Sequence, residues 1–300
     1  MLRGVLGIDP GQIEPYEAGP SGSAFYHSFE VRPKRRDKKS RRIDCPVAGL
    51  KDVQRAILER ILSGVAPHAA ATAYFPGRSV ADNARRHHGC RYLYKTDISN
   101  FFGSITVDAV WRVLELRFPY LSRGAMAEIV DLTTFKGALP QGAPTSPHIA
   151  NLALYEFDES ISLLCRRLGA TYTRYADDIA ISGDDEEAMG IAAVAVRSGL
   201  AELGLAQHPS KTRLYGESAR KVVTGLDVSS DIVRPTRAFR KKAATLVRMC
   251  EVYPDRMEKH VRRVRGYMSY WHGTTPDDPD LQALQARMDR LSASRHFVST

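Results

Sequence analysis

The sequence predicts an α+β protein built on an antiparallel sheet and followed by a smaller helical subdomain. Two observations support this prediction. Helical and strand-like segments alternate up to about residue 235 without a regular period, and three helical segments then follow one another. A doubly wound parallel sheet would need a regular alternation of strands and helices. A chain of 300 residues can bury roughly three quarters of its unfolded surface, so no disulfide or metal is needed for folding.

Composition restricts the function classes. The chain has 43 Lys and Arg against 34 Asp and Glu, a net charge of +9, and no segment long and apolar enough for a membrane span. The four cysteines lie tens of residues apart without a CxxC pair, which argues against a disulfide framework or a thiolate zinc site. We therefore expect a cytoplasmic protein without a membrane partner, whose positive charge favours a polyanionic partner, with nucleic acid first.

The first predicted element is a hairpin with a cationic tip. The run RPKRRDKKSRR, residues 32–42, holds eight basic residues and one acidic residue, and apolar Val31 and Ile43 flank it. Two strand-like ends around a charged loop are typical of a hairpin. Its tip would present cations to a phosphate backbone.

Apolar spacings of three and four predict the helices of the larger domain. One helix is expected over residues 49–62, one from Ser146 to about Gly169 with Ser146 as its cap, and one over residues 186–203. Between them, residues 91–98 and 171–182 have the composition of strands.

The C-terminal subdomain is predicted to be helical and basic. Its expected helices cover residues 236–252, 255–271 and 278–291, with breaks at Pro254 and at the Gly273–Pro276 turn. Residues 234–265 contain eleven Lys and Arg against three acidic residues. Such a surface suits a nucleic-acid backbone.

Three carboxylates carry the predicted chemistry. Asp177 and Asp178 stand in TYTRYADDIAIS at an expected hairpin turn, and Asp97 ends the strand-like run YLYKT. If the two segments are neighbours in one sheet, the carboxylates form a site for hard divalent cations such as Mg²⁺. Two such ions can activate a 3′-hydroxyl and stabilise a departing pyrophosphate.

A loop rich in proline precedes the helix that starts at Ser146. In LPQGAPTSP, Gly142 permits close approach of a ligand to the backbone, and Gln141 offers donors and an acceptor to a base or sugar. The loop is interpreted as the floor of a substrate pocket.

In order and spacing these segments resemble the motifs of reverse transcriptases, and within that family the bacterial retron type. TDISNFF is similar to the first acidic motif, LPQGAPTSP to the second, and YADD to the metal-binding turn. NARRH at residues 83–87 and VTG at residues 223–225 resemble two short retron signatures.

The resemblance implies a right-hand polymerase architecture of fingers, palm with antiparallel sheet, and helical thumb. The expected boundaries are an N-terminal extension at 1–23, fingers at 24–90 with 119–145 shared between fingers and palm, palm at 91–233 and a basic thumb at 234–300.

The resemblance also implies roles for residues. Asp97, Asp177 and Asp178 would be catalytic and would bind two Mg²⁺ ions. Nucleotide contacts are expected from Arg41, Phe102, Gln141, Gly142 and Lys211, with Phe102 as the aromatic that excludes a ribose 2′-hydroxyl. RNA contacts are expected from Asn83, His87, Val223, Thr224, Gly225, Arg240, Lys241, Arg262 and Arg263.

The implied function is RNA-directed DNA synthesis in a retron, in which part of a cognate structured noncoding RNA is copied into DNA (msDNA). The implied partners are that RNA, the RNA–DNA hybrid, dNTPs and a separately encoded effector protein used in antiphage defence. Two alternatives stay open. One is a non-catalytic RNA-binding protein on a polymerase scaffold, although such a protein should have lost one of the three acids. The other is a reverse transcriptase of another bacterial system, such as a group II intron or an abortive-infection locus.

Overall fold

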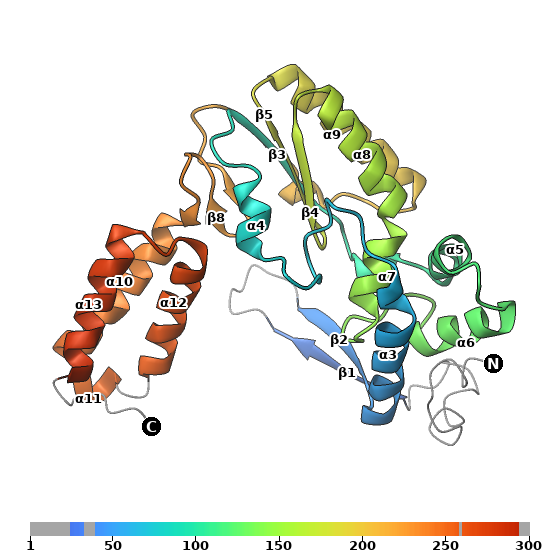
Figure 1. The fold of residues 1–300 in the computed structure, drawn as a ribbon, viewed down its shortest axis with the longest axis horizontal. Coiled ribbons are helices and arrows are strands. Elements are labelled where there is room, and N and C mark those ends of the chain that lie inside the picture. Colours follow the sequence, from blue (N-terminus) through green and yellow to red (C-terminus); the bar gives the residue numbers. More distant parts are fainter. Residues whose placement is uncertain (1–24, 33–39, 258–259, 294–300) are drawn as a thin grey trace.

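The computed structural model describes residues 25–32, 40–257 and 260–293 of the chain (Figure 1). Strands β1 (Tyr26–Val31) and β2 (Arg41–Pro46) pair antiparallel, with Val31 opposite Arg41. The predicted hairpin is confirmed. The expected basic tip at 33–39 and the N-terminal extension at 1–23 lie outside the described residues.

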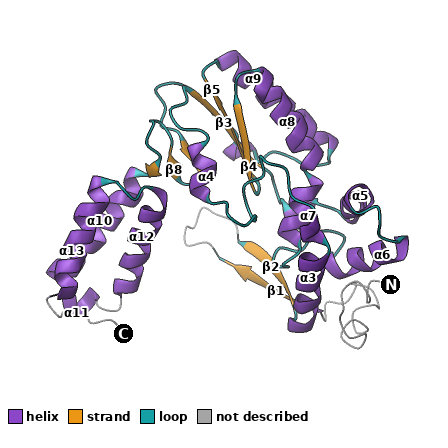
Figure 2. Cartoon of the chain, viewed as in Figure 1, coloured by secondary structure: helices purple, strands orange, loops and turns teal. Residues whose placement is uncertain are grey.

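A four-stranded antiparallel sheet lies at the centre of the larger part of the molecule. Its strand order is β4-β5-β3-β6. The strands are β3 (Tyr92–Asp97), β4 (Thr171–Tyr175), β5 (Asp178–Gly183) and β6 (Arg213–Tyr215). The antiparallel sheet of the predicted α+β fold is therefore confirmed (Figure 2).

Six helices enclose the main hydrophobic core, and the last two of them pack against this sheet. They are α3 (Ala48–Arg60), α5 (Val107–Arg117), α6 (Arg123–Thr133), α7 (Ser146–Ala153), α8 (Tyr155–Arg167) and α9 (Glu186–Glu202). The core unites them with the sheet through fully buried residues such as Ile57, Leu114, Ile179 and Leu200.

One predicted helix is divided in two. The segment from Ser146 to about Gly169 is interrupted at Leu154, whose φ of −98° and ψ of 11° leave the helical range. Ser146 does not cap α7, because its hydroxyl donates to the carbonyl of Pro140 at 2.8 Å instead. The apolar pattern continues across the break, so periodicity could not reveal it.

A second, small sheet joins the central sheet to a short helix. Strands β7 (Val222–Val223), β8 (Leu226–Asp227) and β9 (Arg234–Pro235) are antiparallel. They share an apolar cluster with α4 (Val80–Arg85) and with strand β3.

The C-terminal helices form a separate unit with their own core (Figure 1). They are α10 (Arg237–Val252), α11 (Pro254–Met257), α12 (Val261–Thr274) and α13 (Pro279–Ala293). Trp271 is 1% exposed at the centre of this core, and its indole donates to Asp278 at 3.0 Å. The predicted helix over 255–271 is divided between α11 and α12. In the described ranges, no helix has the length and apolar character needed to cross a membrane.

Candidate active site

A tight turn between β4 and β5 carries two of the three carboxylates. Ala176 adopts a left-handed backbone conformation, with φ of +57°, which reverses the chain directly before Asp177. Asp178 begins β5 and lies opposite Asp97 in the register of β3 and β5. The amide of Ile98 donates to the carbonyl of Asp177 at 2.9 Å. The end of β3 and the turn are therefore held side by side, as the sequence predicted.

Burial and neighbouring charges act differently on the three carboxylates. Burial raises the pKa of Asp177, and the charge of Asp97 raises it further. Burial also raises the pKa of Asp178, where the ammonium of Lys95, 3.3 Å from its Oδ2, acts in the opposite direction. Lys211 lies 2.7 Å from Oδ2 of Asp97. Lys211, which is expected to contact the nucleotide, is therefore paired with Asp97 in this structure.

The donor set suits a hard divalent cation. Three carboxylates from β3 and the turn offer only oxygen ligands, and the repulsion that raises the pKa of Asp177 would be relieved by a bound cation. Within the described residues, no three His, Cys, Asp or Glu side chains have the arrangement of a complete metal site. Two of the carboxylates instead face ammonium groups, from Lys95 and Lys211.

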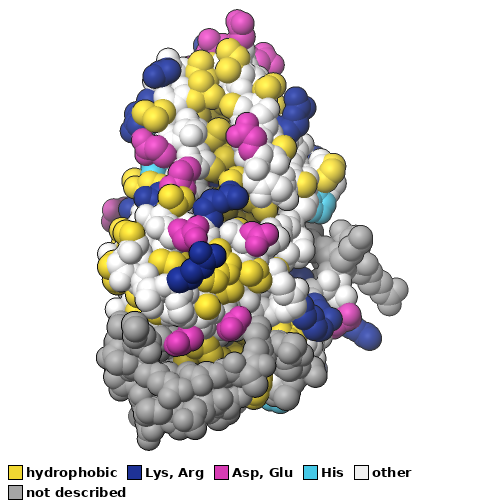
Figure 3. Space-filling view, turned by 90° about the vertical axis from the view of Figure 1, so that its right-hand side faces the viewer, with side chains coloured by type: hydrophobic (Ala, Val, Ile, Leu, Met, Phe, Trp, Pro, Cys, Tyr) yellow, Lys and Arg dark blue, Asp and Glu magenta, His cyan; other side chains and the backbone are white. Residues whose placement is uncertain are grey.

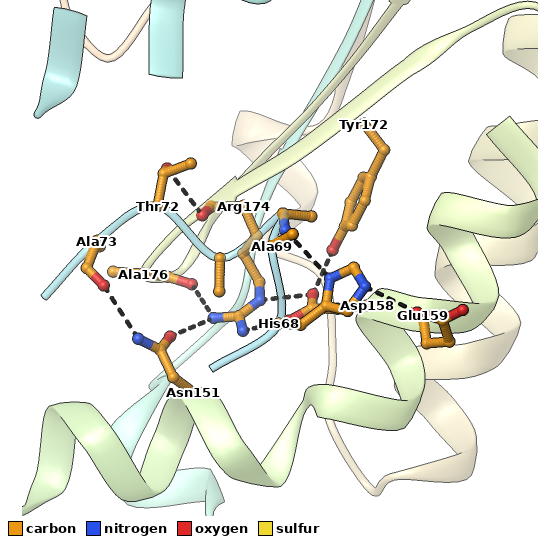
Figure 4. A network of polar contacts seen from close by, with 12 residues as sticks. His68, Ala69, Thr72, Ala73, Asn151, Asp158, Glu159, Tyr172, Arg174 and Ala176 are labelled. Atoms are coloured by element: carbon orange, nitrogen blue, oxygen red, sulfur yellow. Dashed lines mark hydrogen bonds and ion pairs between the residues drawn. The ribbon is translucent and has the colours of Figure 1, made fainter. Parts of the chain in front are cut away.

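A buried polar network centred on Arg174 of β4 holds the turn in place (Figure 4). Arg174 is 0% exposed, and its Nη1 donates to the carbonyl of Ala176 and to Oδ1 of Asn151, both at 3.0 Å. Its Nε and Nη2 donate to the two carboxylate oxygens of Asp158 at 2.9 and 2.6 Å. Tyr172 donates to the same carboxylate at 2.6 Å. This bidentate pair holds the guanidinium where it fixes the backbone next to Asp177.

The two neighbouring phenylalanines have different environments. Phe101 is 6% exposed and belongs to the main core, whereas Phe102 is half-buried at the start of a 3₁₀ turn. The ring of Phe102 lies 6.4 Å from that of Tyr74. Burial and the charge of Asp177 raise the pKa of Tyr74. Phe102 is thus the more exposed ring of the pair, and it lies beside Tyr74, which interacts with Asp177.

The proline-rich loop contacts the N-terminal hairpin. The amide of Asp44 in β2 donates to the carbonyl of Gln141 at 2.9 Å. Gly142 has φ of +139°, and a Cβ there would lie 3.0 Å from the carbonyl oxygen of Asp44. Only glycine fits this approach without strain. Arg41 is exposed at the start of β2.

The structure corrects the expectation that Asn83 and His87 contact RNA. Both side chains are 1% exposed. Asn83 accepts from the hydroxyl of Thr72 at 2.8 Å. The two ring nitrogens of His87 lie 2.7 Å from the hydroxyls of Ser182 and Thr173. In this conformation the pair ties the α4 segment to the sheet and cannot reach a bound nucleic acid.

In the Val-Thr-Gly triplet, Val223 ends β7, and Thr224 and Gly225 form a two-residue turn to β8. Val223 is 1% exposed in the small apolar cluster, which excludes side-chain contact with RNA. Thr224 and Gly225 both have positive φ, +46° and +86°, the pattern of a type I′ hairpin turn. The Thr224 hydroxyl donates to the carbonyl of Val80 at 2.9 Å. Gly225 is therefore the exposed position of the triplet.

The basic residues of the C-terminal unit that were expected to contact RNA differ in exposure. Arg240 pairs with Asp280 of α13 at 3.1 Å, and its expected contact with RNA stays a prediction. Lys241, Arg262 and Arg263 are exposed.

Sequence reasoning missed Lys95, Arg174 and Tyr74. Strand alternation places Lys95 on the same face as Asp97, and this signal could have identified it. Nothing in the sequence indicates that Arg174 is buried or that Tyr74 lies near Asp177.

A pocket of about 190 Å³ lies elsewhere, between α5, the α7–α8 junction and the residues after α9. Its lining is mostly apolar, with five leucines, and none of the candidate residues line it. Figure 3 shows the face of the molecule that carries α5, where acidic and basic side chains interrupt the hydrophobic ones. We assign this pocket no catalytic role.

Comparison with known proteins agrees with this geometry. The model of the family described as reverse transcriptase (RNA-dependent DNA polymerase) matches residues 32–228, which include all three carboxylates. The chain belongs to the reverse transcriptase family. Its relatives include the retron Mx162 reverse transcriptase of Myxococcus xanthus, 31% identical over 92% of this chain and 63% of the relative. The retron Mx65 enzyme of that organism is 29% identical over 93% and 69%. The retron Ec86 enzyme of Escherichia coli is 28% identical over 82% and 75%.

The chain spans 63% of the length of the Mx162 relative and 69% of the Mx65 relative. Among solved structures, telomerase from Candida albicans in complex with a fragment of telomeric RNA superposes with a TM-score of 0.55. The match covers 89% of this chain and 63% of that one at 11% identity. It confirms the right-hand polymerase fold, and the resemblance to retron enzymes is likewise confirmed by the relatives.

Proposed function

We propose that the chain is the RNA-directed DNA polymerase of a retron and copies part of a cognate structured noncoding RNA into DNA. One observation carries the proposal. The register of β3 and β5 sets Asp97 opposite Asp178, directly beside the turn that holds Asp177. A chain retaining only RNA binding would have no need of this arrangement, in which burial and the charge of Asp97 both raise the pKa of Asp177 and of Asp178.

Asp97, Asp177 and Asp178 are the residues that would hold two Mg²⁺ ions. Those ions, when bound, supply Lewis acidity toward the attacking 3′-hydroxyl and the departing pyrophosphate. Arg174 contributes by keeping the carbonyl of Ala176, and with it the turn, in a fixed position. Lys95 balances the charge of Asp178.

The incoming dNTP would be held by residues around this site. Lys211 is paired with Asp97 in this structure, and a triphosphate would compete with Asp97 for its ammonium group. Phe102 stands half-buried beside Tyr74 and would exclude a ribose 2′-hydroxyl. Gln141 and Gly142 would form the floor, and Arg41 would approach from the hairpin.

In the proposed division of the chain, residues 24–90 form the fingers, 91–233 the palm and 234–300 the thumb. The separate apolar core of α10–α13 supports a thumb that moves as a unit. Helix α4 packs on the palm sheets, so this part of the proposed fingers is joined structurally to the palm.

The relatives, named as retron enzymes, support the wider biological role. The partners we propose are the noncoding RNA, its hybrid with the new DNA (msDNA), dNTPs and a separately encoded effector that uses the product in antiphage defence.

Replacement Asp177→Asn tests the function. Loss of one metal ligand removes several kcal/mol of transition-state stabilisation, so primer extension on an RNA template should fall by about 10³-fold. RNA affinity should stay within about twofold, because the replacement removes no basic side chain that could bind the backbone phosphates. Asp184→Asn, an exposed carboxylate just beyond the far end of β5, is the matched control and should extend normally. Normal extension by Asp177→Asn would refute the proposed chemistry.

A further inference from the structure

Three aromatic rings gather on the exposed surface of α10 and α12. Phe239 lies 4.9 Å from Tyr267 and 5.1 Å from Tyr270, measured between ring centroids, at tilts of 39° and 47°. Together with Arg263 and Gly266 they line an open hollow of about 250 Å³, called here the aromatic hollow. Tyr270 is 37% exposed although its ring is large and apolar.

Cations border these rings. The ammonium of Lys242 lies 5.5 Å from the centroid of the Tyr267 ring. Hydrogen bonding to Lys242, aided by Arg263, lowers the pKa of Tyr267. Aromatic faces interleaved with basic side chains are the arrangement by which proteins hold single-stranded nucleic acid.

The aromatic hollow lies toward the palm. A Cβ placed on Gly225, the exposed position of the β7–β8 turn, would be 4.0 Å from the hydroxyl of Tyr270. Burial raises the pKa of Tyr270, and Tyr175, next to the catalytic turn, adds to the effect. A nucleic acid that occupies the hollow would therefore run between the thumb and the palm.

We propose that the aromatic hollow stacks one unpaired base of the RNA, with Tyr267 and Phe239 offering ring faces and Lys242 and Arg263 binding the flanking phosphates. The inference rests on the proposed function in that it supposes an RNA ligand. An unpaired base is favoured over a paired one because the hollow is lined by ring faces, and a base within a duplex has its faces covered by its neighbours. The small volume suits one base rather than a longer segment.

The probe is a hairpin RNA with a three-nucleotide single-stranded extension that carries 2-aminopurine, compared with the same label placed inside the paired stem. The extension label should be quenched on binding, and the stem label should not. Tyr267→Leu should abolish this quenching and weaken binding of the extended hairpin by roughly 5- to 150-fold, the range measured for loss of one stacked base. Tyr267→Phe, which keeps the ring, should bind within about twofold of the wild type.

Tyr253→Leu is the matched control. Tyr253 is also an exposed aromatic of this unit beside a cation, with Arg256 5.8 Å from its ring centroid, but it does not line the aromatic hollow. Its replacement should leave quenching unchanged. Circular dichroism at equal concentration verifies that each variant folds. Arg263→Gln should reduce the slope of log binding constant against log salt concentration by about one, as expected for the loss of one phosphate contact.

Unchanged quenching in Tyr267→Leu would overturn the inference, and so would equal losses for the extended and fully paired hairpins. Binding of RNA by the wild type without quenching, while the protein still copies RNA, would also overturn it and leave the proposed function intact. Failure of the proposed function is recognised separately, by a wild-type protein that synthesises no DNA.

Discussion

His87 makes the stability of this protein depend on pH in a direction that can be stated in advance. Its imidazole is 1% exposed between two hydroxyls, and burial lowers its pKa from 6.5 to about 3. The unfolded chain therefore takes up a proton on His87 as the pH falls below about 6.5, and the folded chain does not. The stabilisation that comes from keeping His87 neutral is fully present above about pH 6.5 and is lost progressively as the pH falls toward about 3.

The size of the effect follows from the two pKa values. Between pH 7 and pH 5, His87 alone should remove about 2 kcal/mol from the free energy of unfolding. The replacement His87→Gln introduces a side-chain amide, which can donate and accept hydrogen bonds as the imidazole does but does not titrate. At pH 7 it should be less stable by about 1–3 kcal/mol, because the two hydrogen bonds to Thr173 and Ser182 are weakened. The gap between variant and wild type should then shrink by about 2 kcal/mol at pH 5.

Urea unfolding followed by circular dichroism at the two pH values measures this difference. Burial also lowers the pKa of His148, but that histidine is present in both proteins and its contribution cancels in the comparison. His88→Gln is the control, because His88 is exposed and adjacent in sequence. Equal losses of stability in wild type and His87→Gln would show that the buried imidazole is protonated in the folded protein and would refute the reasoning.

Two further predictions concern nucleotide selection. Phe102→Ala should raise ribonucleotide incorporation relative to deoxynucleotides by at least tenfold in single-turnover primer extension, and unchanged selectivity would assign Phe102 to packing against Phe101 and Tyr74. Gly142→Ala should destabilise the protein by about 1–3 kcal/mol through a strained φ and raise the KM for dNTPs. The reason is that the added Cβ pushes on Asp44 in the hairpin that carries Arg41. An unaltered KM would separate the hairpin from nucleotide binding.

The arrangement of the carboxylates was predictable because its signals are local. Two β-prone runs around an Asp-Asp pair indicate a hairpin turn, and a strand ending in Asp97 needs only to join the same sheet. The antiparallel sheet then fixes the rest, since cross-strand partners are set by register. The resemblance to reverse transcriptases implied that Lys211 contacts the nucleotide. Its ion pair with Asp97 lies at the carboxylates, and the nucleotide contact itself stays a prediction.

The parts that sequence did not reveal depend on tertiary contacts. Arg174 looks like an exposed strand residue, and its complete burial is tolerated only because Asp158, sixteen positions earlier in α8, neutralises it. The break at Leu154 leaves no mark in the apolar pattern. Asn83 and His87 belong to a polar stretch that reads as a solvent-facing helix, yet the hydroxyls that satisfy His87 come from β4 and β5.

The burial of His87 also changes how the two retron signatures are understood. His87, two residues after α4, hydrogen-bonds to β4 and β5. Within α4, the carbonyl of Val80 accepts from Thr224 in the β7–β8 turn. Arg85 donates to the carbonyl of Thr274 at the end of α12 at 2.9 Å. The segment therefore joins the central sheet, the exposed turn at Gly225 and the C-terminal helices. We expect a replacement within it to disturb the contacts of both the turn and those helices. Loss of RNA binding in a His87 variant would for that reason identify a displaced surface rather than a lost contact, and only exposed positions such as Gly225 can report contact directly.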